Sequence, residues 1–302
     1  DFGADHAFAL VPKKLQEHYG IVISASTVRA ITEYHAGQIY QAEERITDQA
    51  KADGCKILIG EIDGSMIPIV KVDEKADDKR KNKTLQWKEA RLCLVHKVGS
   101  TTPIFGATFS GTVADAGKQL YDCAVQAGFG KGTKLHAVGD GATWIADQID
   151  EQFGAQGSYL IDFYHICDYL AAAAKPCAPM NEKAWLDKQK ELLKQNDYQR
   201  VLDELDAFLE ADTIESQNAP VRACHRYIKN RPHQLDYRAA LAQGLPIGSG
   251  EIESAHRYII QQRLKLPGAW WTPDNVDSML ALRVIRANNK WDEYWNQQRQ
   301  AA

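Results

Sequence analysis

The chain has 302 residues, of which 44% are apolar and 25% charged, and 36 Lys and Arg against 40 Asp and Glu give a formal net charge of −4. These are ordinary globular values, so they exclude collagen-like, low-complexity and polyanion-coating chains. The length indicates about two domains. No apolar run reaches the ~18–20 residues that a membrane span needs, so we expect no membrane partner.

The cysteines are scattered and include no Cys-X-X-Cys pair. This pattern favours reduced thiols over a disulfide framework. The opening residues do not resemble a signal peptide, so we expect a cytoplasmic protein. A zinc site made of His165, Cys167, Cys177 and His225 is a weak alternative, because their spacing fits no familiar zinc template.

Residues 1–52 predict an N-terminal helical segment. One helix ends at Gly20, and a second begins after the capping hydroxyl of Ser24. A polar helix from Gln38 to about Lys51 follows. Helix, tight turn and serine-capped helix are typical of a helix-turn-helix that enters a DNA groove, but an ordinary helical hairpin gives the same pattern.

Residues 53–178 predict the first part of an α/β core. Apolar runs predict a hairpin or two strands around Gly64, within 56–70, and further strands at 90–96 and 103–109. Helices are then expected over 113–127, 143–153 and 163–174, with strands over 135–140 and 158–162 between them. This order indicates a mixed sheet with helices on both faces.

The pattern becomes all-α over 179–245. Apolar side chains between Trp185 and Leu209 recur at the spacing of one helix face, and residues 181–215 carry ten acids against five bases. We therefore predict a helical insertion with a small core of its own. The last segment, 246–302, is predicted to return helices to the α/β core.

Two acids at predicted strand ends are candidates for chemistry. Asp63 lies in the first strand region, and Asp140 ends the strand 135–140. Ligands gather beyond the carboxyl ends of strands in open α/β sheets, so we expect the two carboxylates to lie together there. A divalent cation would relieve their repulsion, and oxygen ligands favour Mg²⁺ or Mn²⁺ over zinc. An ordinary Asp-Gly turn explains either residue taken alone.

A third acid is expected on the helix that follows the glycine-rich loop 244–250. Its predicted apolar stripe consists of Ile252, Ala255 and Ile259. Glu253 lies beside this stripe and can lean towards a cleft, whereas a surface ion pair with Arg257 is its alternative. Glu251 lies in the first turn, where the helix dipole alone explains an acid. We therefore choose Glu253 first and Glu251 second.

Several motifs occur in a recognisable order. They are Ile62-Asp63-Gly64, Val138-Gly139-Asp140-Gly141, Asp162-Phe163-Tyr164-His165, the segment 248–254, and the trailing segments 263–268, 270–271 and 280–283. Over about residues 56–295 the chain resembles bacterial insertion-sequence transposases of the Asp-Asp-Glu type, in the branch related to Mutator-like elements. The resemblance implies a ribonuclease-H-like catalytic fold, a D/CxxH signature after the second Asp and an all-α insertion before the Glu.

The resemblance also implies roles for individual residues. Asp63, Asp140 and Glu253 resemble the catalytic, metal-binding acids, and Asp162 and His165 resemble a pair that supports the active site. The N-terminal helices resemble the segment that recognises element ends. The implied partners are double-stranded DNA, both element ends and target, and further copies of the chain in a homodimer or larger assembly, working at the bacterial nucleoid.

The expected chemistry is hydrolysis at the element ends followed by transfer of a DNA 3′-hydroxyl to target DNA. Two Mg²⁺ or Mn²⁺ ions, about 3.5–4 Å apart, would clamp the scissile phosphate. Two alternatives stay open. One is a ribonuclease-H-like nuclease or resolvase without strand transfer, and the other is a catalytically silent, transposase-derived DNA-binding protein.

Local basic clusters are the predicted DNA contacts, since the net charge is acidic. These contacts are Lys79, Arg80, Lys81 and Lys83 in a basic run, and Arg257, Arg263 and Lys265 around the Glu-bearing helix. Phosphate contacts make such binding weaken steeply with salt. Trp270 and Trp271 are candidates to stack on an unpaired base, and core packing of at least one of them is the preferred alternative.

Overall fold

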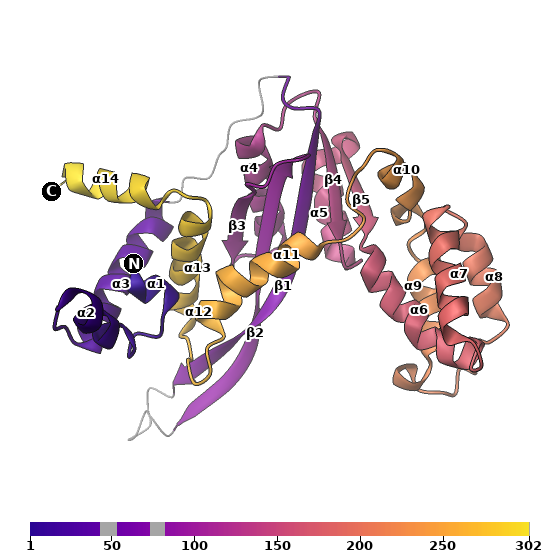
Figure 1. Ribbon diagram of the computed structural model, residues 1–302, viewed down its shortest axis with the longest axis horizontal. Coiled ribbons are helices and arrows are strands. Elements are labelled where there is room, and N and C mark those ends of the chain that lie inside the picture. The colour runs from indigo at the N-terminus through magenta and orange to yellow at the C-terminus, as the bar shows by residue number, and fades with distance from the viewer. Residues whose placement is uncertain (43–52, 73–81, 302) are drawn as a thin grey trace. The chain divides into compact units, whose positions relative to one another are not determined.

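The computed structural model describes residues 1–42, 53–72 and 82–301. They belong to two compact units, Asp1–Thr133 with Glu251–Ala302, and Lys134–Gly250. The five strands follow the order β3-β2-β1-β4-β5, with antiparallel pairing among β1, β2 and β3 and parallel pairing of β4 with β5. Helices flank the strands in both units (Figure 1), so the predicted mixed α/β class is confirmed.

The sheet of the first unit contains β1 (Ile57–Val72), β2 (Lys83–Lys97) and β3 (Ile104–Thr108). The hairpin or strand pair predicted around Gly64 is wrong, because β1 is one continuous strand that pairs with β2 from Leu58 to Val72. Gly64 lies opposite Arg91, and a Cβ there would collide with the carboxylate of Glu89. The glycine therefore does not form a turn; its missing Cβ leaves space for the side chain of Glu89 on the neighbouring strand.

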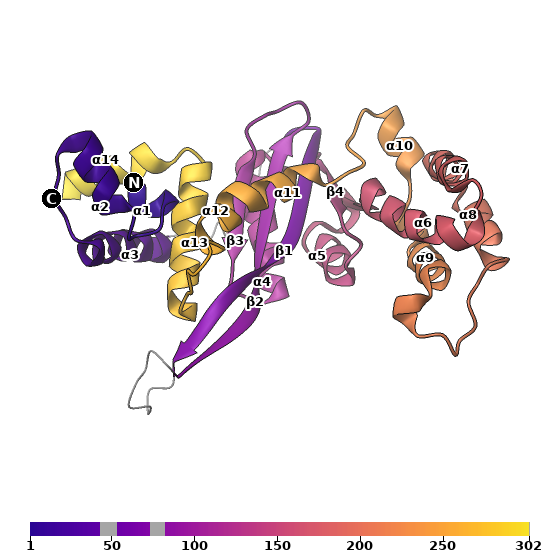
Figure 2. The ribbon, with the colours of Figure 1, turned by 60° about the horizontal axis from the view of Figure 1, so that its bottom comes forward.

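Side-chain alternation gives this sheet two different faces. On one face, Ile67, Ile69, Leu92 and Leu94 join a core completed by the C-terminal helices. These helices are α11 (Gly250–Ala255), α12 (Gln262–Leu264), α13 (Pro273–Ala287) and α14 (Trp291–Ala301). The other face is covered by α4 (Val113–Ala127), which ends in left-handed backbone at Gly128. Figure 2 shows α11 lying across β1 and β2.

The N-terminal helices α1 (Phe2–Asp5), α2 (Val11–Tyr19) and α3 (Ala25–Ala42) belong to the first unit, where α1 and α3 pack on α13. As predicted, α2 ends at Gly20, whose φ is 67°, and the Ser24 hydroxyl accepts the Thr27 N–H at 3.0 Å. The predicted break before Gln38 is wrong, because α3 continues through Gly37. The rest of the predicted polar helix, 43–51, lies outside the described residues.

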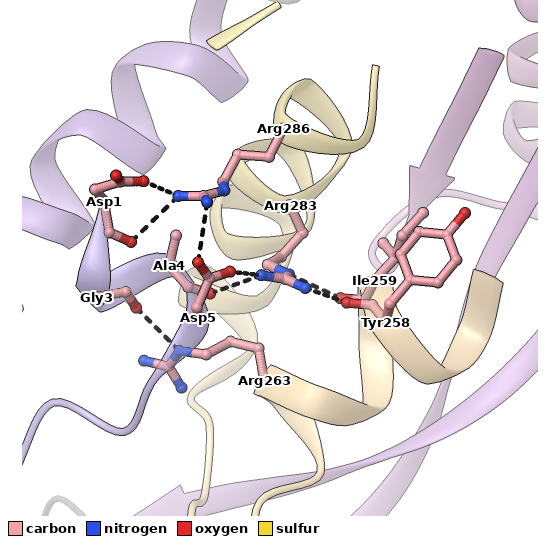
Figure 3. A network of polar contacts seen from close by, with 9 residues as sticks. All are labelled: Asp1, Gly3, Ala4, Asp5, Tyr258, Ile259, Arg263, Arg283 and Arg286. Carbon is pink, nitrogen blue, oxygen red and sulfur yellow. Dashed lines mark hydrogen bonds and ion pairs between the residues drawn. The ribbon is translucent and has the colours of Figure 1, made fainter. Parts of the chain in front are cut away.

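One π-helical stretch, His256–Gln261, connects α11 to α12. In a π-helix, hydrogen bonds between residues five apart replace the α-helical bonds between residues four apart. Arg283 on α13 binds two of its carbonyl groups, those of Tyr258 and Ile259, the latter at 3.2 Å from Nε. The same guanidinium pairs with Asp5 of α1 (Figure 3). Arg283 therefore stabilises the irregular helix and holds α1 beside it.

The second unit contains β4 (Lys134–Gly139) and β5 (Gly157–Ile161), joined by α5 (Thr143–Phe153) and followed by α6 (Phe163–Cys177). Helices α7 (Glu182–Lys194), α8 (Tyr198–Asp206), α9 (Pro220–Lys229) and α10 (Tyr237–Ala242) occupy the stretch predicted to be all-α. Leu193, Val201, Leu205 and Cys224 are fully buried in this unit. Helix α6 packs on α7 and α9 and so connects the strands with the helical part.

Burial of His136 on β4 is expected to make the stability of the second unit depend on pH. Its buried ring donates from Nε2 to the Pro246 carbonyl at 2.8 Å, and burial lowers its pKa. Because the folded pKa lies below the unfolded value of about 6.5, this contribution is present above that pH and lost as the pH falls through the folded pKa. We expect the free energy of unfolding, measured with urea, to decline below about pH 6.5, and His136→Gln to reduce that decline. An unchanged decline in the variant would contradict this origin.

Candidate active site

Two of the predicted catalytic acids lie in the first unit, on elements that pack against each other. Asp63 lies within β1 and not at a strand end as predicted, and it is half-buried on the sheet face that meets α11. Its Oδ1 accepts the Gly64 N–H at 2.7 Å, and its Oδ2 lies 3.2 Å from Nε2 of His256. Glu253 is exposed on α11, three residues before His256 and so on the same side of the helix. The predicted stripe of Ile252, Ala255 and Ile259 is buried, as expected.

Glu61 fixes the start of the helix that carries Glu253. Its side chain is buried, and Oε2 accepts the N–H of Ile252 at 2.7 Å. The first N–H groups of a helix have no partner within the helix and favour a negative charge beside them. The first turn of α11 is therefore held against β1, two residues along the strand from Asp63.

Glu251, the second choice for the third acid, has a partner on the sheet. Its Oε2 lies 3.1 Å from Nε2 of His96, a buried residue of β2 whose Nδ1 is 2.9 Å from the Lys97 carbonyl oxygen. Glu253, in contrast, forms no ion pair with Arg257 or another base among the residues that the structure describes. Glu253 therefore has the less engaged of the two carboxylates on α11, since Glu251 lies beside His96.

His256 completes this cluster from the first residue of the π-helical stretch. It is 4% exposed, and its contact with Asp63 lacks hydrogen-bond alignment, so neither ring nitrogen has a hydrogen-bond partner within the described chain. Buried polar atoms usually have such partners. His256, His96 and Glu61 were not among the residues predicted from the sequence. For Glu61 the signal was available, because it precedes Asp63 by two residues and so shares its strand face.

Asp140 lies in the second unit, directly after β4, and is half-buried. Its Oδ1 accepts the Ala142 N–H at 2.8 Å, and its carbonyl accepts the hydroxyl of Tyr227 at 2.6 Å. Arg231 donates from Nε to the neighbouring Gly141 carbonyl at 2.9 Å. Two side chains of the helical part therefore hold the loop that carries this acid.

The supporting pair, Asp162 and His165, lies at the start of α6. Asp162 is 4% exposed, and its Oδ1 caps the helix by accepting the N–H groups of Tyr164 and His165 at 2.6 and 3.1 Å. Its Oδ2 accepts the N–H and hydroxyl of Ser249 at 2.7 and 2.6 Å, which fixes the residue just before α11. His165 packs against Tyr227, the residue that holds the Asp140 carbonyl, with ring centres 5.9 Å apart.

The predicted DNA contacts differ in their placement. Lys79, Arg80 and Lys81 lie outside the described residues. Lys83 is exposed at the start of β2, with Nζ 5.0 Å from the ring centre of Trp270, and Arg257 is exposed on the π-helical stretch. Lys265 is half-buried, and burial lowers the pKa of its ammonium group.

Arg263 is not on the surface, where the prediction placed it. It is 2% exposed and donates from Nε to the Gly3 carbonyl at 3.0 Å. Its guanidinium carbon lies 4.5 Å from the ring centre of Phe8 and 4.8 Å from that of Trp271. Trp271 is 5% exposed and donates to the Leu264 carbonyl at 3.2 Å, which confirms core packing for this one of the two tryptophans. Trp270 is 54% exposed.

The carboxylates of the proposed site suit hard divalent cations by their chemistry. Asp63 is half-buried and Glu253 exposed, and carboxylate oxygens are the ligands that Mg²⁺ and Mn²⁺ prefer. Among the residues that the structure describes, there is no group of three or more His, Cys, Asp or Glu side chains placed so that it could hold a metal ion. The oxygen donors of Asp63 and Glu253 therefore fit the expected cation by their chemistry.

The strands and the acid–histidine cluster define a mixed α/β protein with polar side chains on one sheet face. A family model, that of the uncharacterised protein family UPF0236, matches residues 129–299, and the chain belongs to this family. No curated protein matches the sequence. None of the described helices has both the length and the apolar composition needed to span a bilayer.

Proposed function

We propose that the protein is a DNA transposase that cleaves and joins phosphodiester bonds with Asp63, Asp140 and Glu253. The observation that carries the proposal is the seating of the Glu253 helix on the Asp63 strand. Glu61 binds the first turn of α11, and His256 on the following stretch lies 3.2 Å from Asp63. Two acids far apart in the sequence are thus carried by adjoining elements, as metal-dependent phosphodiester chemistry needs.

A ribonuclease-H-like fold is part of this proposal. Three antiparallel strands followed by a parallel pair, in the order β3-β2-β1-β4-β5, support it. The helices α7–α10 between Asp162 and Glu253 also support the all-α insertion that the resemblance implies. The protein would act in the cytoplasm, as a homodimer or larger assembly on element ends and target double-stranded DNA.

The residues around the acids have positioning roles in the proposed mechanism. Two Mg²⁺ or Mn²⁺ ions held by the three carboxylates would, when bound, activate a water or a DNA 3′-hydroxyl and stabilise the leaving oxygen. Glu61 and His256 restrain α11 and Asp63, which limits the carboxylate positions available. Tyr227 and Arg231 fix the Asp140 loop. Such restraint reduces reorganisation when the substrate phosphate binds.

The test is a combined cleavage and joining assay. The full chain is incubated with supercoiled plasmid and labelled duplexes tiled across the DNA that flanks its own gene, with Mg²⁺, Mn²⁺ or EDTA. We expect metal-dependent cutting of a flanking duplex and covalent transfer of its label to the plasmid. Cutting without transfer would favour the nuclease alternative, and binding without cutting would favour the silent DNA-binding protein.

A further inference from the structure

A pocket of about 400 Å³ lies in the first unit and is lined by none of the proposed catalytic acids. Its walls come from the N-terminal helices, the paired ends of β1 and β2, and the chain that follows α12. The side chains that matter here are Phe8, Arg29, Lys83, Arg263, Trp270 and Trp271. All belong to one compact unit, so the pocket is formed within it.

The pocket presents an exposed aromatic ring on a fixed backbone. Trp270 is 54% exposed, whereas the neighbouring Trp271 is buried. The Trp271 carbonyl accepts the Val70 N–H at 2.9 Å, which ties this segment to β1 as a short bridge. Lys83 places its ammonium group 5.0 Å from the Trp270 ring centre. An exposed indole beside a cation is a surface on which a nucleic-acid base stacks.

The pocket also contains an unsatisfied buried donor. Arg263 is 2% exposed and uses Nε for the Gly3 carbonyl, but its Nη2 has no hydrogen-bond partner within the described chain. Burial lowers the pKa of this guanidinium to about 10, which leaves it charged at neutral pH. A buried guanidinium with an unused donor carries poorly compensated positive charge, and at the wall of a pocket this charge favours an anionic ligand group.

The charge of the pocket favours an anion. Arg29 pairs with Glu33 at 2.9 Å, and Glu33 also accepts from Asn275 at 3.0 Å. Lys83 and Arg263 are the other cations of the lining, so bases outnumber acids. A flat ring to stack on Trp270 and an anionic oxygen for Arg263 are the two features that a nucleotide combines.

We propose that this pocket binds a single unpaired nucleotide of a DNA strand, with its base on Trp270 and its phosphate oxygens at Arg263 and Lys83. The inference rests on the proposed function in taking DNA as the substrate. An unpaired base is required because a base inside a duplex is stacked on its neighbours and has no free face for the indole.

The test compares three labelled DNAs by fluorescence anisotropy: a single strand, a fully paired duplex, and a duplex with one extrahelical 2-aminopurine. We expect Trp270→Ala to weaken binding of the single strand and the bulged duplex by about tenfold, with little change for the paired duplex. Trp270→Phe should retain most of the affinity. The 2-aminopurine emission should change on binding to the wild-type protein and to Trp270→Phe but not to Trp270→Ala.

Trp87→Ala is the matched control, since Trp87 is 57% exposed on β2 and does not line the pocket. It should bind all three DNAs as the wild type does. Lys83→Gln should lower the slope of log K against log salt for the bulged duplex by about one. The proposal is overturned if Trp270→Ala keeps full affinity for the bulged duplex, loses affinity equally for all three DNAs, or behaves like Trp87→Ala.

Asp63→Asn separates this inference from the proposed function, because it should abolish cutting and leave the preference for unpaired DNA unchanged. A Trp270-dependent preference for unpaired DNA in a protein that never cuts DNA would refute the proposed transposase activity but support the nucleotide-binding pocket. Metal-dependent cutting and joining without that preference would refute the nucleotide-binding pocket but support the proposed transposase activity.

Discussion

Asp63→Asn is expected to reduce metal-dependent DNA cutting by about a thousandfold or more. Removing the negative charge removes a metal ligand, and a loss of about 4 kcal/mol in transition-state stabilisation corresponds to that factor. The fold should be retained, because the Asn side-chain oxygen can still accept the Gly64 N–H. The rate of plasmid nicking in Mg²⁺ measures the loss, and circular dichroism checks the fold.

The two glutamates of α11 provide a matched comparison for the same assay. Glu253→Gln should be as damaging as Asp63→Asn, whereas Glu251→Gln should cost less than about tenfold, because Glu251 is paired with His96. The opposite order would give the catalytic role to Glu251. An Asp140→Ala protein that still nicks element-end DNA with Mg²⁺ would show that the three acids are assigned wrongly.

The sequence predicted those parts of the fold that local signals determine. Gly20 and Gly128 end helices in left-handed backbone, and the Ser24 hydroxyl caps α3, each from chemistry within a few residues. Gly64 misled the prediction, because its role depends on Glu89 on the neighbouring strand. A glycine in an apolar run favours a turn or a close approach, and only the pairing of β1 with β2 distinguishes them.

For the candidate site, too, local sequence patterns were predictable and long-range contacts were not. Asp140 could be selected from the sequence because an acid directly after a strand is a local pattern. Asp63 was selected by the same pattern, but it lies within the continuous strand β1. Glu61 could be placed on the strand face of Asp63, but its role and that of His256 could not be predicted. Both roles come from contacts between β1 and the helix region about 190 residues later, as the Glu61–Ile252 hydrogen bond shows. Arg263 was also expected on the surface because it is charged, whereas contacts with aromatic neighbours bury it.

Asp162→Ala is expected to lower the free energy of unfolding by about 3–5 kcal/mol, since it removes a buried carboxylate that accepts four hydrogen bonds and leaves their donors unpaired. Asp168→Ala, on the exposed side of the same helix, should change stability by less than about 0.5 kcal/mol. Urea unfolding of both variants at pH 7 measures the difference.

The link from Asp162 to Ser249 can be measured separately. A double-mutant cycle with Asp162→Ala and Ser249→Ala should give a coupling free energy of about 1–3 kcal/mol, because both hydrogen bonds of Oδ2 end on Ser249 and one uses its hydroxyl. Ser249→Ala alone should also slow DNA cutting, since it loosens the residue just before the helix of Glu253. Additive effects, or full cutting by Ser249→Ala, would mean that Asp162 serves α6 alone and that the acid on α11 is positioned without it.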